Sequence, residues 1–192
     1  MGRTVRYPCS ESGNNRMKWI ALPLLGVYLV EIEPAIDERG FFARTWCSEE
    51  MKSKGLVSEL AQCSLSYNVR RGTVRGMHYQ AQPYAETKLV RCQAGAVYDV
   101  VLDLRPSSAT YCRWFAAELN AVNHKALYIP EGCAHGFQCL ADHSQVFYQI
   151  SQSYRPECAR GVRWDDALFG IDWPMKEAIL SERDRSFPDF RP

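Results

Sequence analysis

The feature that most constrains the fold is a succession of short segments rich in strand-forming residues, which begins near residue 18 and continues for most of the chain. Dipeptides such as Arg71-Gly72 and Ala94-Gly95 separate the segments, and glycine-containing dipeptides of this kind mark turns. We predict strands at residues 20–33, 40–46, 60–68, 73–80, 88–93, 96–104, 114–119, 126–129, 136–140, 145–150 and 161–164. Helical signals are confined to residues 48–53 and to the stretch after Pro174. The pattern therefore predicts a mostly β protein with a few short helices, mainly near the C-terminus.

Residues 96–104 show the period of two that is typical of a half-buried strand. One face would carry Val97, Asp99, Val101 and Asp103, and the other Tyr98, Val100, Leu102 and Leu104. Many short strands with regular turns predict a β-sandwich or barrel, with the jelly roll among the candidates. Because the chain contains no repeat or linker, we predict one domain at residues 18–192, preceded by an irregular arm at residues 1–17.

The composition excludes several classes of protein. The 192 residues carry a net charge of +1, which provides no general field for nucleic acid, and 46% of them are apolar, which is ordinary for a globular domain. The eight cysteines include no C-x-x-C pair, so buried, reduced thiols and a cytoplasmic location are expected. The apolar run at residues 19–30 contains Pro23 and is shorter than the roughly 20 residues that span a bilayer, so no membrane segment is expected.

Two histidines lie in similar glycine-containing segments, and together they suggest either a metal centre or proton transfer. The spacing Pro130-x-Gly132-x-x-His135 resembles the second half of the cupin signature, a double-stranded jelly roll. The first half of that signature normally offers His-x-His, but this chain has Gln80 two residues after His78. Glutamine is a poor ligand for transition metals, so proton transfer is favoured. The alternative is a metal-dependent cupin that uses His78, Glu86 and His135.

Seven segments in the same order resemble the dTDP-4-dehydrorhamnose 3,5-epimerase family, which consists of metal-free cupins that act on nucleotide-linked 4-keto-6-deoxy sugars. The segments lie at residues 37–42 (DERGFF), 75–80 (RGMHYQ), 88–92 (KLVRC), 97–105 (VYDVVLDLR), 130–137 (PEGCAHGF), 147–148 (FY) and 164–166 (WDD). The resemblance implies an isomerase with a jelly-roll fold and with neither a metal nor a cofactor. It also implies epimerisation at C3, at C5 or at both, through an enolate.

The resemblance assigns the proton chemistry to four residues. His78 matches the family's base, and Asp184 matches the carboxylate that orients this histidine. Tyr148 matches the acid that returns a proton from the opposite face. Lys88 matches a residue close to the enolate oxygen, where a positive charge stabilises the transition state. Without the family, a single strand histidine such as His78 is more often a satisfied core residue.

Further residues are implied in substrate binding. Arg39 and Arg75 are candidates for the pyrophosphate, because guanidinium groups bind phosphate oxygens in a bidentate manner. Tyr154 matches an aromatic residue that packs on the nucleobase, and Phe42 a residue that reaches the site from the partner subunit of a homodimer. By resemblance, His135 and Gln62 also belong to the substrate site.

Two departures from the family pattern concern the substrate. Arg44 stands where members often have glutamate. The usual Gln-x-Asn ahead of the active histidine reads Gln62-Cys63-Ser64 here, with an extra residue before His78. These changes leave the nucleobase open between thymine and cytosine, and a C3-only or C5-only epimerase that uses a CDP- or dTDP-sugar is an alternative. A non-enzymatic sugar-binding module is a third hypothesis, although a binder needs neither a base nor an acid.

Overall fold

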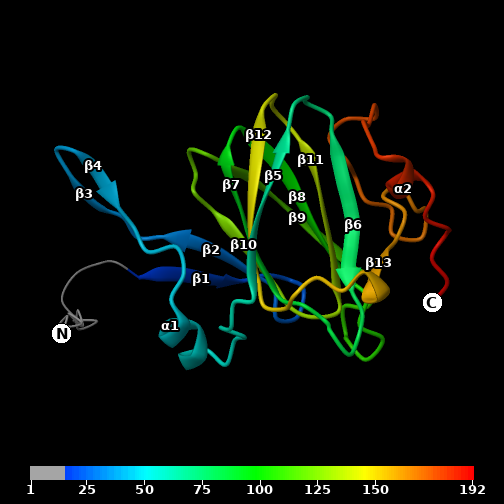
Figure 1. Cartoon of the computed structure of the whole chain (residues 1–192), viewed down its shortest axis with the longest axis horizontal. Helices are drawn as coiled ribbons and strands as arrows, with labels where there is room; N and C mark the ends of the chain where they lie inside the picture. The colour runs from blue at the N-terminus through cyan, green and yellow to red at the C-terminus, as the bar shows by residue number, and fades with distance from the viewer. Residues whose placement is uncertain (1–15) are drawn as a thin grey trace.

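The computed structural model describes residues 16–192, which form two facing antiparallel β-sheets and a separate hairpin (Figure 1). The first sheet has the order β1 (Met17–Ala21), β2 (Tyr28–Ile32), β10 (Ala126–Ile129), β7 (Lys88–Ala94), β12 (Ser144–Ile150) and β5 (Gln62–Asn68). The second has the order β13 (Ala159–Gly161), β6 (Val74–Gln80), β11 (Cys133–Cys139), β8 (Ala96–Asp103) and β9 (Trp114–Asn120). The hairpin consists of β3 (Ala35–Asp37) and β4 (Gly40–Phe42). This arrangement is a jelly roll, so the predicted fold class is confirmed.

Residues 16–192 also contain three short helical segments. The first, α1 (Ser48–Ser53), has the predicted bounds, while α2 (Glu182–Arg185) lies in the predicted C-terminal stretch. A 3₁₀ turn, η1 (Pro156–Cys158), precedes β13. Within the described part of the chain, no helix has the length and apolar character needed to cross a membrane.

Apolar side chains fill the space between the two sheets and also cover both outer faces. The inner cluster joins residues such as Val90 and Val146 of the first sheet to Val101 and Phe137 of the second. A second cluster, which includes Val100 and Leu102, lies under the C-terminal segment, and a third packs α1 against the first sheet. The two predicted faces of β8 thus contribute to two different clusters. The prediction that this strand is half-buried is wrong, because both of its faces are covered.

Two of the predicted boundaries also need correction. The single strand expected at residues 20–33 is two strands, because a turn closed by the Leu22 N–H to Val27 O bond separates β1 from β2. The strand expected at residues 40–46 ends at Phe42, and its partner β3 was not predicted. Of the predicted arm at residues 1–17, residues 1–15 lie outside the described residues, while Met17 begins β1 and is buried. The limits of the domain remain a prediction.

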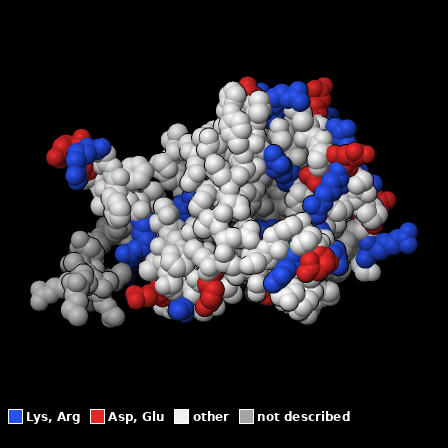
Figure 2. Space-filling model, viewed as in Figure 1, with Lys and Arg blue, Asp and Glu red and all other residues white. Residues whose placement is uncertain are grey.

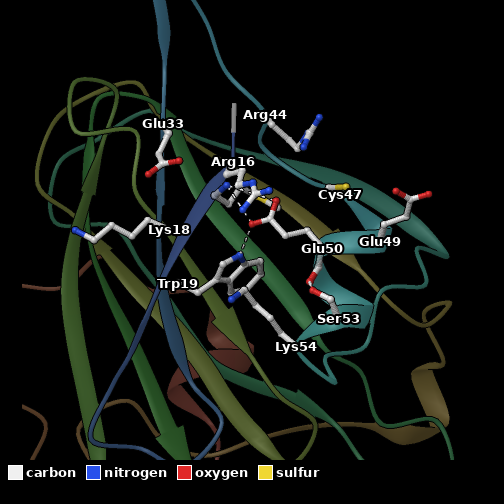
Figure 3. Close-up of a pocket in the computed structure, with 11 residues that line it drawn as sticks. Arg16, Lys18, Trp19, Glu33, Arg44, Cys47, Glu49, Glu50, Ser53 and Lys54 are labelled. Carbon is white, nitrogen blue, oxygen red and sulfur yellow. Dashed lines mark hydrogen bonds between the residues drawn. The ribbon is translucent and has the colours of Figure 1, made fainter. Parts of the chain in front are cut away.

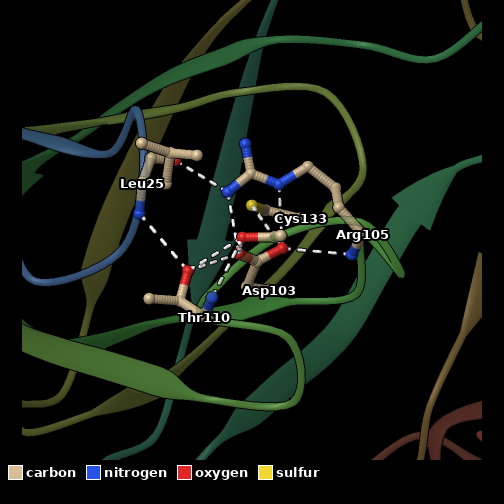
Figure 4. A network of polar contacts seen from close by, with 6 residues as sticks. Leu25, Asp103, Arg105, Thr110 and Cys133 are labelled. Atoms are coloured by element: carbon tan, nitrogen blue, oxygen red, sulfur yellow. Dashed lines mark hydrogen bonds and ion pairs between the residues drawn. The ribbon is translucent and has the colours of Figure 1, made fainter.

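A buried carboxylate holds the long β8–β9 connection against the body of the protein (Figure 4). Asp103 is fully buried and accepts hydrogen bonds from the Arg105 guanidinium at 2.8 Å and from the hydroxyls of Ser108 and Thr110 at 2.6 Å. Arg105 also donates to the backbone oxygen of Leu25. The carboxylate therefore organises the connection itself, and Arg105 links it to the turn between β1 and β2.

Candidate active site

Strands of both sheets contribute to one cavity of about 290 Å³. The lining residues are Gln62, Ser64 and Ser66 of β5, Arg75 and His78 of β6, Glu86, Lys88 of β7, His135 of β11, Tyr148 and Ile150 of β12, and Tyr154. All the predicted catalytic residues except Asp184 line it directly, as do four of the predicted binding residues: Gln62, Arg75, His135 and Tyr154. The structure thus brings together residues that are spread over almost one hundred positions of the sequence.

His78 and Asp184 form a close pair at the edge of the cavity. The His78 Nε2 atom lies 2.7 Å from Asp184 Oδ1, and Asp184 is buried. Burial raises the pKa of Asp184, but the hydrogen bond and charge of His78, together with the Gly76 N–H, outweigh it, so the pKa is lowered. When neutral His78 donates its Nε2 proton to this carboxylate, Nδ1 is left unprotonated. This tautomer can act as a base.

The C-terminal segment brings Asp184 to the histidine. Asp184 lies in α2, where its backbone N–H donates to the Ser181 side chain at the start of the helix. The Phe187 ring that follows packs edge-on against the His78 ring, with centroids 6.1 Å apart. Gly161 of β13 leaves the space for this ring, because a Cβ atom there would overlap Phe187. Phe187 was not singled out from the sequence, and no local motif distinguishes it.

The two histidine segments are in direct contact through glycines. Gly76 has a φ of +139°, and a Cβ atom on it would lie 2.5 Å from the Cα atom of Gly136. A Cβ atom on Gly136 would in turn lie 2.6 Å from the Met77 sulfur. Because neither position has room for a side chain, β6 and β11 approach closely next to His78 and His135.

Lys88 is buried in the cavity wall and forms an ion pair with Glu86. Its Nζ atom lies 2.9 Å from Glu86 Oε1 and 3.4 Å from the backbone oxygen of His78. The carboxylate that was considered as a metal ligand is therefore directed at the lysine. Nowhere in residues 16–192 do three His, Cys, Asp or Glu side chains form a group that could hold a metal ion. His78, Glu86 and His135, the residues of the alternative site, do not form such a group.

A second buried pair lies beside Tyr148. His135 Nε2 lies 2.9 and 3.0 Å from the two oxygens of Asp99, and its ring contacts the Tyr148 ring edge-on at 5.8 Å. Burial raises the pKa of Tyr148, and the nearby charge of Asp99 raises it further. Asp99 was not predicted as a site residue. Its place among the inward-facing residues of β8 was the available signal, since a carboxylate on a buried face requires a partner.

Three of the residues singled out from the sequence lie elsewhere in the single chain. Arg39 and Phe42 belong to the β3–β4 hairpin, which projects away from both sheets (Figure 1). Arg39 pairs with Asp37 of the same hairpin, and Phe42 is 70% exposed. Arg44, which was expected near the substrate, instead lines another cavity of about 500 Å³ beside α1 (Figure 3). There Glu50 accepts a hydrogen bond from the Trp19 indole at 3.0 Å.

Jelly-roll sheets that bring a histidine paired with a carboxylate, a lysine and a partly buried tyrosine to one cavity define a class of proton-transfer sites. The family profile described as dTDP-4-dehydrorhamnose 3,5-epimerase matches residues 21–192, and the chain belongs to this family.

Individual relatives agree with this assignment. A dTDP-4-dehydrorhamnose 3,5-epimerase of Sinorhizobium fredii is 38% identical over 91% of this chain and 90% of the relative. A dTDP-4-dehydrorhamnose 3-epimerase of Streptomyces niveus is 38% identical over 88% of this chain and 82% of the relative. The crystal structure of the Bacillus anthracis 3,5-epimerase, with TDP and pyrophosphate bound, is 37% identical and has a TM-score of 0.88. The match covers 91% of this chain and 100% of the Bacillus anthracis chain.

Proposed function

We propose that the protein is an isomerase that inverts C3 and C5 of a dTDP-linked 4-keto-6-deoxyhexose. The observation that carries this proposal is the position of the two proton carriers. His78 lies on β6 of the second sheet and Tyr148 on β12 of the first, and both line the same cavity. A base and an acid on opposite walls are what the inversion of a carbon requires.

The chemistry follows from the acidity of carbons next to a ketone. Nδ1 of His78 removes the proton, and Asp184 stabilises the imidazolium that forms. The negative charge moves to the carbonyl oxygen, where the ammonium group of Lys88, a residue that is 8% exposed, stabilises it. Tyr148 then delivers a proton from the other wall. The sequence of steps conserves electrons within the substrate and therefore needs no redox partner.

Substrate binding is proposed to involve both this cavity and a second subunit. Arg75 and Tyr154 line the cavity and would hold the pyrophosphate and the base of the nucleotide. Arg39 and Phe42 could reach a substrate only in the site of a partner, because their own hairpin projects away from the sheets. We therefore propose a homodimer in which each hairpin completes the other subunit's site.

The surface of the chain supports a homodimer. The hairpin exposes Ile36 at 78% and Phe42 at 70%, and β5 exposes Leu65 at 55%. The surface over β5 and β12 carries few charged side chains in the view of Figure 2. Exposed apolar side chains with few charges among them are typical of a surface that contacts another protein chain.

A second candidate function is inversion at a single carbon, which is favoured by the similarity to the Streptomyces niveus protein named as a 3-epimerase. Incubating a dTDP-4-keto-6-deoxyhexose in deuterated water separates the two candidates. Label at both C3 and C5 supports the 3,5-epimerase, and label at one carbon supports the alternative. If neither carbon takes up label, both candidate functions are excluded. A CDP-linked substrate assayed in parallel identifies the nucleotide.

A cytoplasmic location is proposed because the buried thiols of Cys92, Cys133 and Cys139 are unpaired.

His78→Asn tests the assignment of the base. We expect a loss of activity of about 10²–10⁴-fold, the range typical of a general base, with the fold retained. Turnover and deuterium exchange are measured together with the circular dichroism spectrum. His143→Asn is the matched control, because His143 is exposed and bonds to Tyr67 outside the cavity. A folded His78→Asn variant with normal turnover would refute the role.

A further inference from the structure

Gln80 has a function that the metal interpretation of its position does not explain. It lies two residues after His78 on β6, is 2% exposed and does not belong to the cavity lining. Its amide nitrogen donates to the backbone oxygens of Tyr84 and Ser153, at 2.5 and 3.2 Å, and its oxygen accepts from the Arg155 N–H at 2.7 Å. The side chain thus uses both its donor and its acceptor on segments outside its own strand.

These hydrogen bonds hold both chain neighbours of Tyr154. Ser153 and Arg155 are bound by Gln80 of the second sheet, while the backbone N–H of Tyr154 donates to Gln62 Oε1 of the first sheet at 2.9 Å. Two glutamines from opposite sheets therefore fix three consecutive residues at the edge of the cavity. The Arg155 guanidinium also lies 4.8 Å from the centre of the Tyr84 ring, which joins the two segments that Gln80 binds.

The Tyr154 side chain itself has little support from the protein. Tyr154 is 56% exposed, and its ring lines the cavity from a segment without regular secondary structure. The position of the ring is therefore determined by the backbone of residues 153–155. If a segment is already ordered in the free protein, the entropic cost of ordering it does not weaken ligand binding.

We propose that Gln80 is a positioning residue that orders the 153–155 segment, so that Tyr154 forms a preformed platform for the base of the nucleotide. The inference rests on the proposed function, because it assigns the nucleotide to this end of the cavity. Gln80 acts through Tyr154 and takes no part in proton transfer. An amide is required because a carboxylate cannot donate to the two carbonyl oxygens and an apolar side chain can neither donate nor accept.

The experiment compares Gln80→Met with a matched variant, Gln138→Met. Gln138 is also fully buried and also bonds through both amide atoms, to the backbone of Met175, away from the cavity. For every variant, the dissociation constant of dTDP is measured by calorimetry. The values of kcat and KM are measured with the dTDP-sugar, and Tm is measured as well. For Gln80→Met we expect about tenfold weaker dTDP binding and a similar rise in KM, with kcat and its pH profile unchanged. For Gln138→Met we expect a lower Tm with normal dTDP binding.

A double-mutant cycle tests whether Gln80 acts through the tyrosine. Tyr154→Ala should weaken dTDP binding by about 5- to 150-fold, the range for stacking between a base and an aromatic ring. In the Tyr154→Ala background, Gln80→Met should then change the dissociation constant by less than about twofold. If Gln80→Met is too unstable to purify, Gln80→Glu is used in the same cycle, because it keeps the shape and the acceptor but removes the donor.

The outcomes separate this inference from the proposed function. Unchanged dTDP binding in the Gln80 variants, or equal weakening with and without Tyr154, would overturn the positioning role while leaving the epimerase intact. A loss of affinity in Gln138→Met as large as that in Gln80→Met would also overturn it, by showing a general effect of stability. Failure of the wild-type protein to bind dTDP or to exchange label would instead refute the proposed function itself.

Discussion

At the scale of single residues, the two proposed proton carriers differ in their surroundings. His78 keeps 38% of its side chain exposed, and its Nε2 atom lies 2.7 Å from Asp184 Oδ1. Burial raises the pKa of Tyr148, and the charge of Asp99 adds to this effect, so the phenol keeps its proton throughout the neutral and mildly alkaline range. Tyr148 therefore remains protonated and can donate a proton over this range. Ionisation of Tyr148 should therefore not reduce turnover in the mildly alkaline range, which a pH–rate profile measures.

Tyr148→Phe should separate proton removal from inversion. The variant lacks the acid but keeps the base, so His78 can remove a proton and return a solvent-derived one to the same face. We expect inversion to fall by about 10²–10⁴-fold, while deuterium still enters the substrate with its configuration retained. Mass spectrometry gives the label and NMR gives the configuration. Equal losses of exchange and inversion would show that Tyr148 does not act as a separate acid.

The residues that could be identified from the sequence are those within recognisable motifs. His78, Lys88 and Tyr148 lie in segments that match the family, and the structure places all three in one cavity. The partners of these residues could not be assigned, because a side chain's partner depends on which strands become neighbours. Glu86 was considered as a metal ligand although it faces Lys88, and Gln80 was read only as a missing ligand although it binds the 153–155 segment.

At the scale of elements, connections determine where strands begin and end, and this is where the sequence was least informative. The period of two in β8 was visible, but the cover on its outer face comes from the C-terminal segment, which local periodicity cannot reveal. By contrast, the apolar run at residues 20–33 did contain a signal of the turn between β1 and β2, because Pro23 and Gly26 interrupt it and Gly26 has a φ of +76°. The connection after β8 is held by four side-chain hydrogen bonds to the carboxylate of Asp103.

Asp103→Asn should destabilise the fold in a pH-dependent manner. Burial alone would raise the pKa of Asp103, but the hydrogen bonds from Arg105, Ser108 and Thr110 outweigh it and lower the pKa. The stabilisation is therefore complete above the unfolded pKa of about 3.9 and is lost as the pH falls through the lower folded value. We expect the variant to lose about 2–4 kcal/mol at pH 7 by urea denaturation, and the difference from wild type to shrink below about pH 4.

The control for Asp103 is Asp165→Asn, because Asp165 pairs with Arg163 at the surface. This exposed pair should contribute little, so denaturation of the control should match that of the wild type. A difference between Asp103→Asn and the wild type that stayed constant from pH 7 to pH 3 would contradict the role of the ionised carboxylate.

Gly161→Ala should disturb catalysis through α2. The added methyl group would collide with the Phe187 ring and displace the segment that carries Asp184. A displacement of about 1 Å in a catalytic group can cost about 10²-fold, so we expect kcat to fall by about 10- to 100-fold with the sheets intact. The second change Phe187→Leu should restore part of the activity, because a smaller side chain accommodates the methyl group. Normal kcat in Gly161→Ala would show that this packing does not position Asp184.

At the scale of the whole molecule, the proposed site is divided between two chains. Phe42→Asp places a charge on the exposed hairpin and should convert the proposed dimer into a monomer, as measured by light scattering after gel filtration. Because Arg39 and Phe42 would no longer reach the partner's cavity, kcat/KM should fall together with dimerisation. The control is Leu168→Asp, because Leu168 is 49% exposed and lies between β13 and α2, far from the hairpin in the sequence. A wild-type monomer with full activity would contradict the arrangement.

The contact between Gly76 and Gly136 has a consequence for how such a site can diversify. It fixes the separation of the two histidine strands by backbone atoms alone, so the separation does not depend on the side chains that line the cavity. Substitutions at positions such as Ser64 or Ser66 can therefore reshape the cavity wall without moving His78 or His135. A scaffold with this property can acquire new substrates by gradual change at its walls, each intermediate retaining some turnover. The existence of relatives named for inversion at two carbons and at one is consistent with such a history.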